Sequence, residues 1–330
     1  MIRASFLCNV LLLVPLLSSA QRFETVEAAG ARWFRGNTHS HTINTDGDSP
    51  PDTVVSWYRA RGYNFLVISD HDTITDPATL RRYQDSTFIL IPGEEVTGRY
   101  GPVPTHLTAI NLPRIVTPDT GGSVLETLQR NIDAIRAAGG VPLINHPNYR
   151  WALDRATLLQ VQRVALFELY NGHPYVHNDG GGGTPSTEEQ WDAMLSAGKR
   201  VYGVASDDAH HWKRWGREMV NPDRGWIYVR ADRLDPSVIT RAIEAGRFYA
   251  STGVQLDDVV VTPRSIEVRV RQDRDSRYRI EFIGDGGRVL ARTDGLSARY
   301  DLKDDVTYVR ARVTDSAGRR AWVQPVFVVR

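Results

Sequence analysis

Short apolar runs alternate with amphipathic stretches along most of this chain, from residue 33 to about residue 250. The runs have the length of buried strands, and the stretches between them carry apolar residues at helical spacing. The clearest runs are at residues 65–68, 88–91, 106–112, 141–144, 164–169 and 201–205, and the clearest helical stretches are at 52–61, 123–138, 187–197 and 236–245. Strands that alternate with helices predict βα units around a mostly parallel, buried sheet. With about seven such units, a closed barrel is favoured over an open sheet.

The pattern changes after about residue 253. Apolar and polar residues then alternate in four runs, at 266–271, 278–282, 308–313 and 323–329, with turn residues between them. Period-two alternation without a helical pattern predicts an antiparallel sheet, here a small β-sandwich of about 75 residues.

The first 20 residues have the layout of a secretory signal peptide. Arg3 precedes an apolar run at 6–17, and Ser18-Ser19-Ala20 offers small residues for cleavage. The run is too short for a comfortable membrane span, although an uncleaved N-terminal anchor is the alternative. Cleavage after Ala20 would remove Cys8, the only cysteine, so the mature chain could not rely on disulfides. We therefore expect a secreted or periplasmic protein without membrane association after cleavage.

The net charge of the chain argues only against stable binding to nucleic acid. The chain has 40 Lys and Arg against 39 Asp and Glu, a formal net charge of +1. That balance gives no basic footprint, so we expect no stable nucleic-acid complex. The oligomeric state is left open by the sequence.

Histidines and carboxylates gather where the predicted strands end. His39 and His41 follow the short run Trp33-Phe34, and alternation in an extended segment points both imidazoles the same way. The further candidates are Asp46, Asp70, His71, Asp72, Glu94, Glu95, His106, His146, Asp207, Asp208 and His210. Because parallel barrel strands place their carboxyl ends on one rim, these side chains would converge. Imidazole and carboxylate together suit zinc, manganese or iron, so the pattern predicts a multinuclear metal centre.

The same stretches resemble the metal motifs of the PHP (polymerase and histidinol phosphatase) family, especially its metal-dependent phosphoesterases. The matching stretches are 37–47 (NTHSHTINTDG), 67–73 (VISDHDT), 91–95 (IPGEE), 144–147 (INHP) and 206–210 (SDDAH). The resemblance covers residues 33 to 253 and all of the family's metal motifs in order. It implies an α/β fold with a distorted (β/α)7 barrel at residues 21–254, followed by the β-sandwich at 255–330.

The resemblance also implies a set of metal ligands. Position by position, they are His39, His41, Asp46, His71, Glu95, His106, His146, Asp208 and His210. The family's Gly-x-Glu spacing selects Glu95 over Glu94, and its Asp-x-His spacing selects Asp208 over Asp207. Asp70 is expected to orient an imidazole, and Glu168 either supports the centre or forms a plain salt bridge. The catalytic residues would be His39, His41, Asp208 and His210.

These ligands imply a function. With three divalent ions, the three carboxylates and neutral imidazoles, the centre would keep a net charge of about +3, which a phosphate group offsets. We expect three ions of manganese, iron or zinc, and hydrolysis of small-molecule phosphate monoesters or diesters by a metal-bridging hydroxide.

Two other functions stay open. An amidohydrolase-type barrel also begins with His-x-His, and Glu95 could replace the bridging carboxylated lysine of such enzymes, which would give a carboxyl-ester or amide hydrolase. A secreted metal-binding or adhesion protein without turnover is the third possibility.

Some polar residues near the predicted rim have no assigned ligand role. His173, His177 and His211 lie in loops, where they are either solvated or contact the substrate. Basic side chains that could clamp a phosphate follow several ligand-bearing strands, namely Arg99, Arg150, Lys213 and Arg214.

Overall fold

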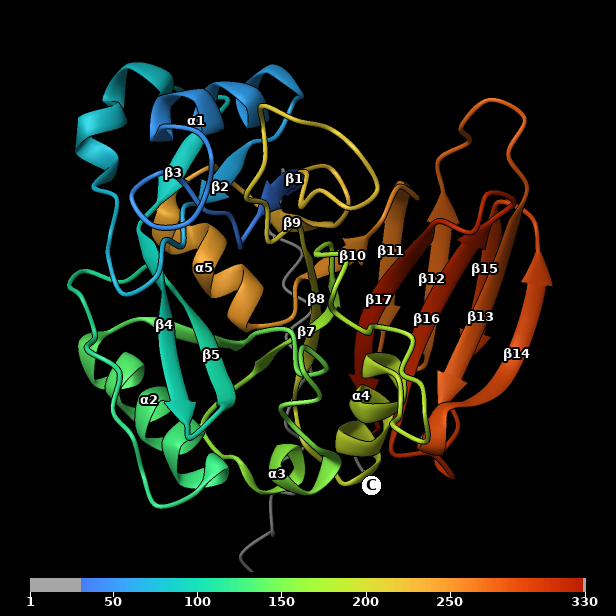
Figure 1. Cartoon of the computed structure of the whole chain (residues 1–330). Coiled ribbons are helices and arrows are strands. Elements are labelled where there is room, and N and C mark those ends of the chain that lie inside the picture. Colours follow the sequence, from blue (N-terminus) through green and yellow to red (C-terminus); the bar gives the residue numbers. More distant parts are fainter. Residues whose placement is uncertain (1–30, 329–330) are drawn as a thin grey trace, which may run out of the picture.

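A computed structural model describes residues 31–328 (Figure 1), so the predicted signal peptide at 1–20 lies outside the described residues. The helices are α1 (Pro51–Ala60), α2 (Val124–Ala138), α3 (Arg155–Gln160), α4 (Thr187–Ser196) and α5 (Pro236–Glu244), with 3-10 turns at Pro77–Tyr83 and Asp285–Gly287. The strands before residue 254 are β1 (Arg32–Asn37), β2 (Phe65–Val67), β3 (Ile89–Ile91), β4 (Gly93–Tyr100), β5 (Val103–Ile110), β6 (Val141–Ile144), β7 (Leu166–Asn171), β8 (Tyr202–Ser206), β9 (Trp226–Ala231) and β10 (Phe248–Ser251). The later strands are β11 (Leu256–Thr262), β12 (Ser265–Val270), β13 (Tyr278–Gly284), β14 (Arg288–Asp294), β15 (Ser297–Asp301), β16 (Tyr308–Asp315) and β17 (Arg320–Phe327).

The predicted helices are confirmed, and their ends follow local capping chemistry. The Ser123 hydroxyl accepts from the backbone N–H of Glu126 at the start of α2, and Gly139 ends that helix in the left-handed conformation. A capping box between Ser186 and Glu189 starts α4. Helices α2 and α4 therefore begin at residues whose side chains satisfy free N–H groups of the first turn, whereas Pro50 before α1 makes no such side-chain bond.

The strands before residue 254 are divided between two sheets. One sheet has the order β4-β5-β6-β7-β8, and in the other β9, β1, β2 and β3 are neighbours. The β4–β5 pair is an antiparallel hairpin, and β9 is antiparallel to β1. Isolated bridges between Ser40 and Ala209 and between His71 and Glu95 join the two sheets.

A closed (β/α)7 barrel is therefore not confirmed, although the α/β class is. Only Pro92 separates β3 from β4, which leaves no room for a crossover helix between them. The chain instead leaves the parallel array there and returns through the β4–β5 hairpin. Beyond that hairpin, β6, β7 and β8 pair in parallel as expected.

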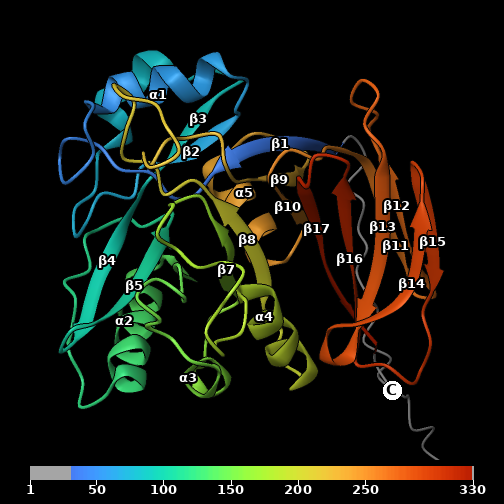
Figure 2. The same cartoon turned by 45° about the vertical axis from the view of Figure 1, so that its right-hand side comes forward.

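The strands after residue 254 form a sandwich. The sheet β11-β12-β15 packs against β13, β16 and β17 around an apolar cluster that includes Ile266, Ile280 and Val309. Strand β17 pairs with β10, so one nine-stranded sheet runs from the C-terminal strands into the N-terminal half (Figure 2). The division at residue 254 stays a prediction.

The two halves are also joined by buried charge. The Arg310 guanidinium, 1% exposed, donates to both oxygens of Asp192 at 2.7 Å and to Glu188 at 2.8 Å, both on α4.

Within residues 31–328, no helix is long and apolar enough to cross a membrane.

Candidate metal centre

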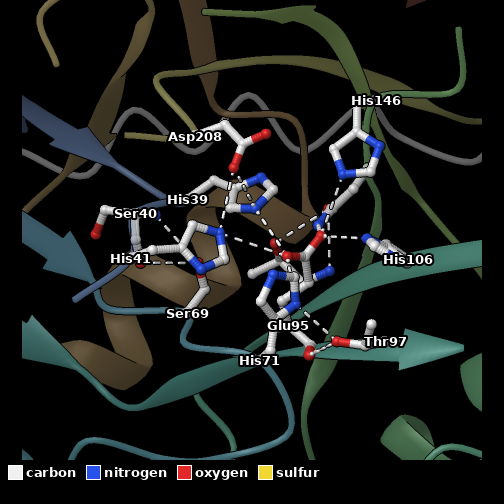
Figure 3. A network of polar contacts seen from close by, with 12 residues as sticks. His39, Ser40, His41, Ser69, His71, Glu95, Thr97, His106, His146 and Asp208 are labelled. Atoms are coloured by element: carbon white, nitrogen blue, oxygen red, sulfur yellow. Dashed lines mark hydrogen bonds and ion pairs between the residues drawn. The ribbon is translucent and has the colours of Figure 1, made fainter. Parts of the chain in front are cut away.

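The fold brings together all nine residues predicted as metal ligands, and Figure 3 labels all of them except Asp46 and His210. Each lies on a strand or in the segment just after one, except for Asp46 in the loop before α1. His39 and His41 follow β1, His71 follows β2, Glu95 and His106 lie on β4 and β5, His146 follows β6, and Asp208 and His210 follow β8. Although the hydrogen-bonded sheet is divided, the strand ends still meet at one place.

Glu95 lies at the middle of the cluster. Its carboxylate is 1% exposed, and its oxygens lie 3.4 Å from Nε2 of both His39 and His41. The same carboxylate lies 3.1 Å from the Nδ1 atoms of His71 and His106. Five imidazoles, including that of His146, therefore surround one buried carboxylate.

Asp208 faces the two histidines that follow β1. Its Oδ1 lies 3.1 Å from His39 Nε2 and 3.2 Å from His41 Nε2. Backbone hydrogen bonds hold the segments together, because Asp208 N donates to His39 O and His41 N donates to Ala209 O. Asp208 has a φ of 51°, a strained conformation that is common at functional sites.

Asp46 lies at the open side of the cluster. Its carboxylate is 51% exposed, and its oxygens lie 3.4 Å from His41 Nδ1, 3.3 Å from His71 Nε2 and 3.4 Å from His210 Nε2. His71 and His210 are also partly exposed, whereas His39 and His41 are fully buried. A substrate would therefore approach from the side of Asp46.

The nine side chains form four groups of potential ligands, each with its ligand atoms within 4.8 Å of one another. The groups are His41–Asp46–His71–His210, His39–Glu95–His146, His39–His41–Asp208 and His71–Glu95–His106. The shared members are His39, His41, His71 and Glu95. Neighbouring groups thus share ligands, as closely spaced metal ions require.

The donor set fits divalent metal ions. Nε2 of His39 and both ring nitrogens of His41 are buried without a hydrogen-bond partner among the described residues. Such atoms are costly to bury unless something satisfies them, and a cation coordinated by nitrogen lone pairs would do so. Imidazole and carboxylate ligands suit zinc, manganese and iron.

Electrostatics keep the carboxylates of the cluster ionised. Burial opposes charge on Glu95 and Asp208, but the imidazoles around them outweigh it and hold both pKa values well below their usual range. Burial likewise opposes charge on His71, yet Asp46 and Glu95 raise its pKa to about 9. For His41, burial and the neighbouring His210 lower the pKa to about 4. The cluster therefore presents anionic oxygens that attract cations.

Glu168 supports the centre through His39, which is the first of the two roles that the sequence left open for it. Its Oε1 accepts from His39 Nδ1 at 2.8 Å and from the Ser206 hydroxyl. Its Oε2 accepts from the backbone N–H of His146 at 2.6 Å and from Asn171 Nδ2 at 2.9 Å. A carboxylate on Nδ1 keeps the proton there and leaves Nε2 free to coordinate a metal.

The expectation for Asp70 was wrong. Its carboxylate orients no imidazole but accepts from Thr42 N at 2.7 Å and from the hydroxyls of Thr42, Thr45 and Thr75. These bonds fix the loop that carries Asp46. The sequence misled because Asp70 precedes His71 along the chain, whereas its side chain points to the other side of the strand end.

Of the two neighbouring carboxylate pairs, the structure places Glu95 and Asp208 in the cluster and their neighbours Glu94 and Asp207 outside it. The Glu94 side chain points away from the cluster, and its Oε1 accepts from Val116 N. Asp207 accepts from Asn37 Nδ2 and from the Tyr58 hydroxyl, among other donors. Burial raises the pKa of Glu94 to about 7 and that of Asp207 to about 6, so neither resembles the strongly ionised carboxylates of the cluster.

Three supporting side chains were missed. Asn145 Nδ2 donates to Glu95 Oε1 at 2.8 Å, and Asn171 Nδ2 donates to Asp208 Oδ2 at 3.1 Å. Thr97 Oγ1 lies 2.7 Å from His71 Nδ1. For Asn145, the available signal was an amide at the end of an apolar strand, next to the predicted ligand His146.

Of the three histidines without a predicted ligand role, His173 lies near the centre, and His177 and His211 lie away from it. The His173 ring lies 5.9 Å from that of His210. His177 stacks on Trp151 at 4.4 Å, and His211 Nδ1 accepts from Val220 N. Of the basic residues considered as phosphate clamps, Arg150 lies over the Tyr149 ring and Arg99 donates to Gly101 O.

Comparisons with known proteins support the fold. Neither the scan against protein-family models nor the search of curated proteins finds a match. Among solved structures, the chain matches a two-domain protein from Bacteroides vulgatus that contains a predicted PHP-like metal-dependent phosphoesterase, with a TM-score of 0.51, 15% identity, and coverage of 86% of this chain and 91% of that one. It also matches a metal-dependent phosphoesterase candidate from Bifidobacterium adolescentis, with a TM-score of 0.41, 17% identity, and coverage of 57% and 93%. At the level of the fold, the resemblance to PHP-like proteins is confirmed.

Proposed function

We propose that the protein is a metal-dependent phosphoester hydrolase whose nine clustered ligands hold three divalent ions. The observation that carries this proposal is that shared ligands link the four groups into a closed ring. His41 joins the first group to the Asp208 group, His39 joins that to the His146 group, Glu95 joins that to the His106 group, and His71 returns to the first. Isolated polar residues at strand ends would not overlap in this way.

Bound divalent ions would act as Lewis acids, lower the pKa of water and offset charge on a phosphoryl group. The chain's own residues supply the rest. Glu168 holds His39 in one tautomer, and Asn145 holds the Glu95 carboxylate. Asp46 and His210 border the open side, where the substrate enters. Turnover depends on His39, His41, Asp208 and His210.

The charge of the centre supports an anionic substrate. Three divalent ions against the three carboxylates of the cluster leave an excess of about +3, which a phosphate monoester or diester offsets. We also propose that manganese, iron or zinc fills the centre, and that the protein acts outside the cytoplasm on small-molecule phosphoesters.

An activity assay with matched variants tests this function. The metal-loaded protein should cleave bis-p-nitrophenyl phosphate or p-nitrophenyl phosphate, and His39→Ala combined with Asp208→Ala should reduce the rate to that of buffer. His177→Ala is the control, because this histidine stacks on Trp151 outside the cluster and its loss should leave the rate unchanged. Cleavage of p-nitrophenyl acetate alone, or full phosphoesterase activity in the double variant, would contradict the proposal.

A further inference from the structure

Aromatic rings line one side of the open centre, and the proposed function does not use them. The Tyr149 ring lies 5.2 Å from that of His146 and 5.9 Å from that of His173. The His173 ring also lies 5.9 Å from that of His210 and 5.5 Å from that of Tyr175. Tyr149, His173 and Tyr175 thus form an aromatic wall that leads outward from two of the candidate ligands.

Two loops hold this wall in place. A backbone bridge joins Tyr149 to Val176. The Asn148 side chain, fully buried, donates to the backbone oxygens of His177 at 2.9 Å and Pro185 at 3.0 Å. The loop after β6 and the loop after β7 are therefore fixed to each other, and the rings they carry keep their positions.

The wall presents polar atoms that the protein leaves unpaired. The backbone N–H of Tyr175 donates to His173 Nδ1 at 3.1 Å, which assigns the ring proton of a neutral imidazole to Nε2. His173 Nε2 and the hydroxyls of Tyr149 and Tyr175 have no hydrogen-bond partner within residues 31–328. A surface that combines fixed rings with a few unpaired polar atoms is typical of a ligand-binding site.

Exposure identifies where a ligand would lie. Tyr175 is 56% exposed, whereas His39, His41 and Glu95 on the inner side of the centre are almost completely buried. A phosphoester held at the centre must therefore extend its organic group outward, and the wall is the neighbouring surface on the side of His146 and His210. An exposed aromatic ring is best covered by another flat ring, through stacking or edge-to-face contact.

We propose that the aromatic wall binds a flat aromatic group of the substrate, so that the substrates are phosphoesters carrying an aryl or heteroaryl ring. This inference rests on the proposed function, because it assumes that the phosphoryl group lies at the metal centre. It adds the chemistry of the organic group, which the metal ligands do not define. Tyr175 contributes the exposed ring that the substrate covers.

Binding of two phosphonates to the metal-loaded protein tests this inference without turnover. Phenylphosphonate should bind about fivefold more tightly than methylphosphonate, because only the first has a ring to pack against the wall. Tyr175→Leu keeps an apolar side chain but removes the ring, so it should bring this ratio close to one without changing the affinity for methylphosphonate. Tyr100→Leu is the matched control, since Tyr100 is 39% exposed at the far end of β4.

The outcomes separate the two claims. A wild-type ratio near one, or a ratio that Tyr175→Leu leaves unchanged, would overturn the aromatic wall as a binding site and leave the proposed function intact. Failure of both phosphonates to bind the metal-loaded protein would overturn the proposed function, and this inference with it.

Discussion

Replacing Glu168 by glutamine should weaken metal binding without unfolding the protein. Each oxygen of the Glu168 carboxylate accepts two hydrogen bonds, Oε1 from His39 and Ser206 and Oε2 from His146 N and Asn171. Whichever way the new amide is turned, its NH2 group meets two donors. With the NH2 group at the Oε1 position, the His39 imidazole loses the partner that keeps its proton on Nδ1 and its Nε2 lone pair available. With the NH2 group at the Oε2 position, His39 keeps only a neutral amide oxygen, a weaker acceptor than the carboxylate.

The magnitude follows from the role of such partners. Losing a group that orients a metal-bound histidine costs about 10- to 100-fold in metal affinity or activity. That range corresponds to about 1.4 to 2.7 kcal/mol. The buried donors left without an acceptor also destabilise the fold, by about 1 to 3 kcal/mol.

Metal titration of purified variants measures this effect, with kcat/KM for a p-nitrophenyl phosphoester as the second readout. Glu94→Gln is the control, because burial raises the pKa of Glu94 to about 7 and its amide oxygen can still accept from Val116 N. We expect Glu94→Gln to stay within about twofold of wild type. Equal metal affinity in Glu168→Gln and wild type would refute the role given to Glu168.

Three further predictions concern pH, stability and processing. The pKa of His71 is about 9 in the folded protein and about 6.5 in the unfolded chain. Its contribution to the stability of the metal-free protein is therefore complete below pH 6.5 and lost towards pH 9, so the metal-free Tm should fall over that range. Metal affinity should rise over the same range, because a metal ion binds the neutral imidazole. A flat metal-free Tm would contradict this. Arg310→Met leaves Asp192 buried without a cationic partner, while Glu188 keeps Arg312, and it should cost about 3 to 5 kcal/mol in urea unfolding; a loss below about 1 kcal/mol would show that the Arg310–Asp192 ion pair is dispensable. Mass spectrometry of the exported protein should find Gln21 at its N-terminus, and retention of residues 1–20 would exclude cleavage there.

The helices and the site could be predicted from sequence because their signals are local. Helical periodicity and capping residues define α2 and α4 within a few residues. The candidate ligands other than Asp46 could be identified because each lies on or just after a strand, and the ends of buried strands converge; Asp46 lies in a loop. His106, on a strand antiparallel to its neighbours, still reaches Glu95 through cross-strand pairing.

The sheet arrangement could not be predicted, because strand direction and pairing depend on distant contacts. Nothing in the residues of β4 shows that it forms a hairpin with β5, and β9 and β10 carry no motif that reveals their pairing with β1 and β17. Side-chain direction was equally hidden for Asp70, whose acceptors are satisfied by threonines spread over two loops. These features are decided by tertiary packing.

Elemental analysis of the purified chain tests the central claim most directly. If the nine clustered residues hold metal ions, the protein should contain two to three equivalents of manganese, iron or zinc per chain after reconstitution. His39→Ala should reduce that content, because His39 belongs to two of the four groups. A wild-type protein that binds none of these metals would contradict the account of the site.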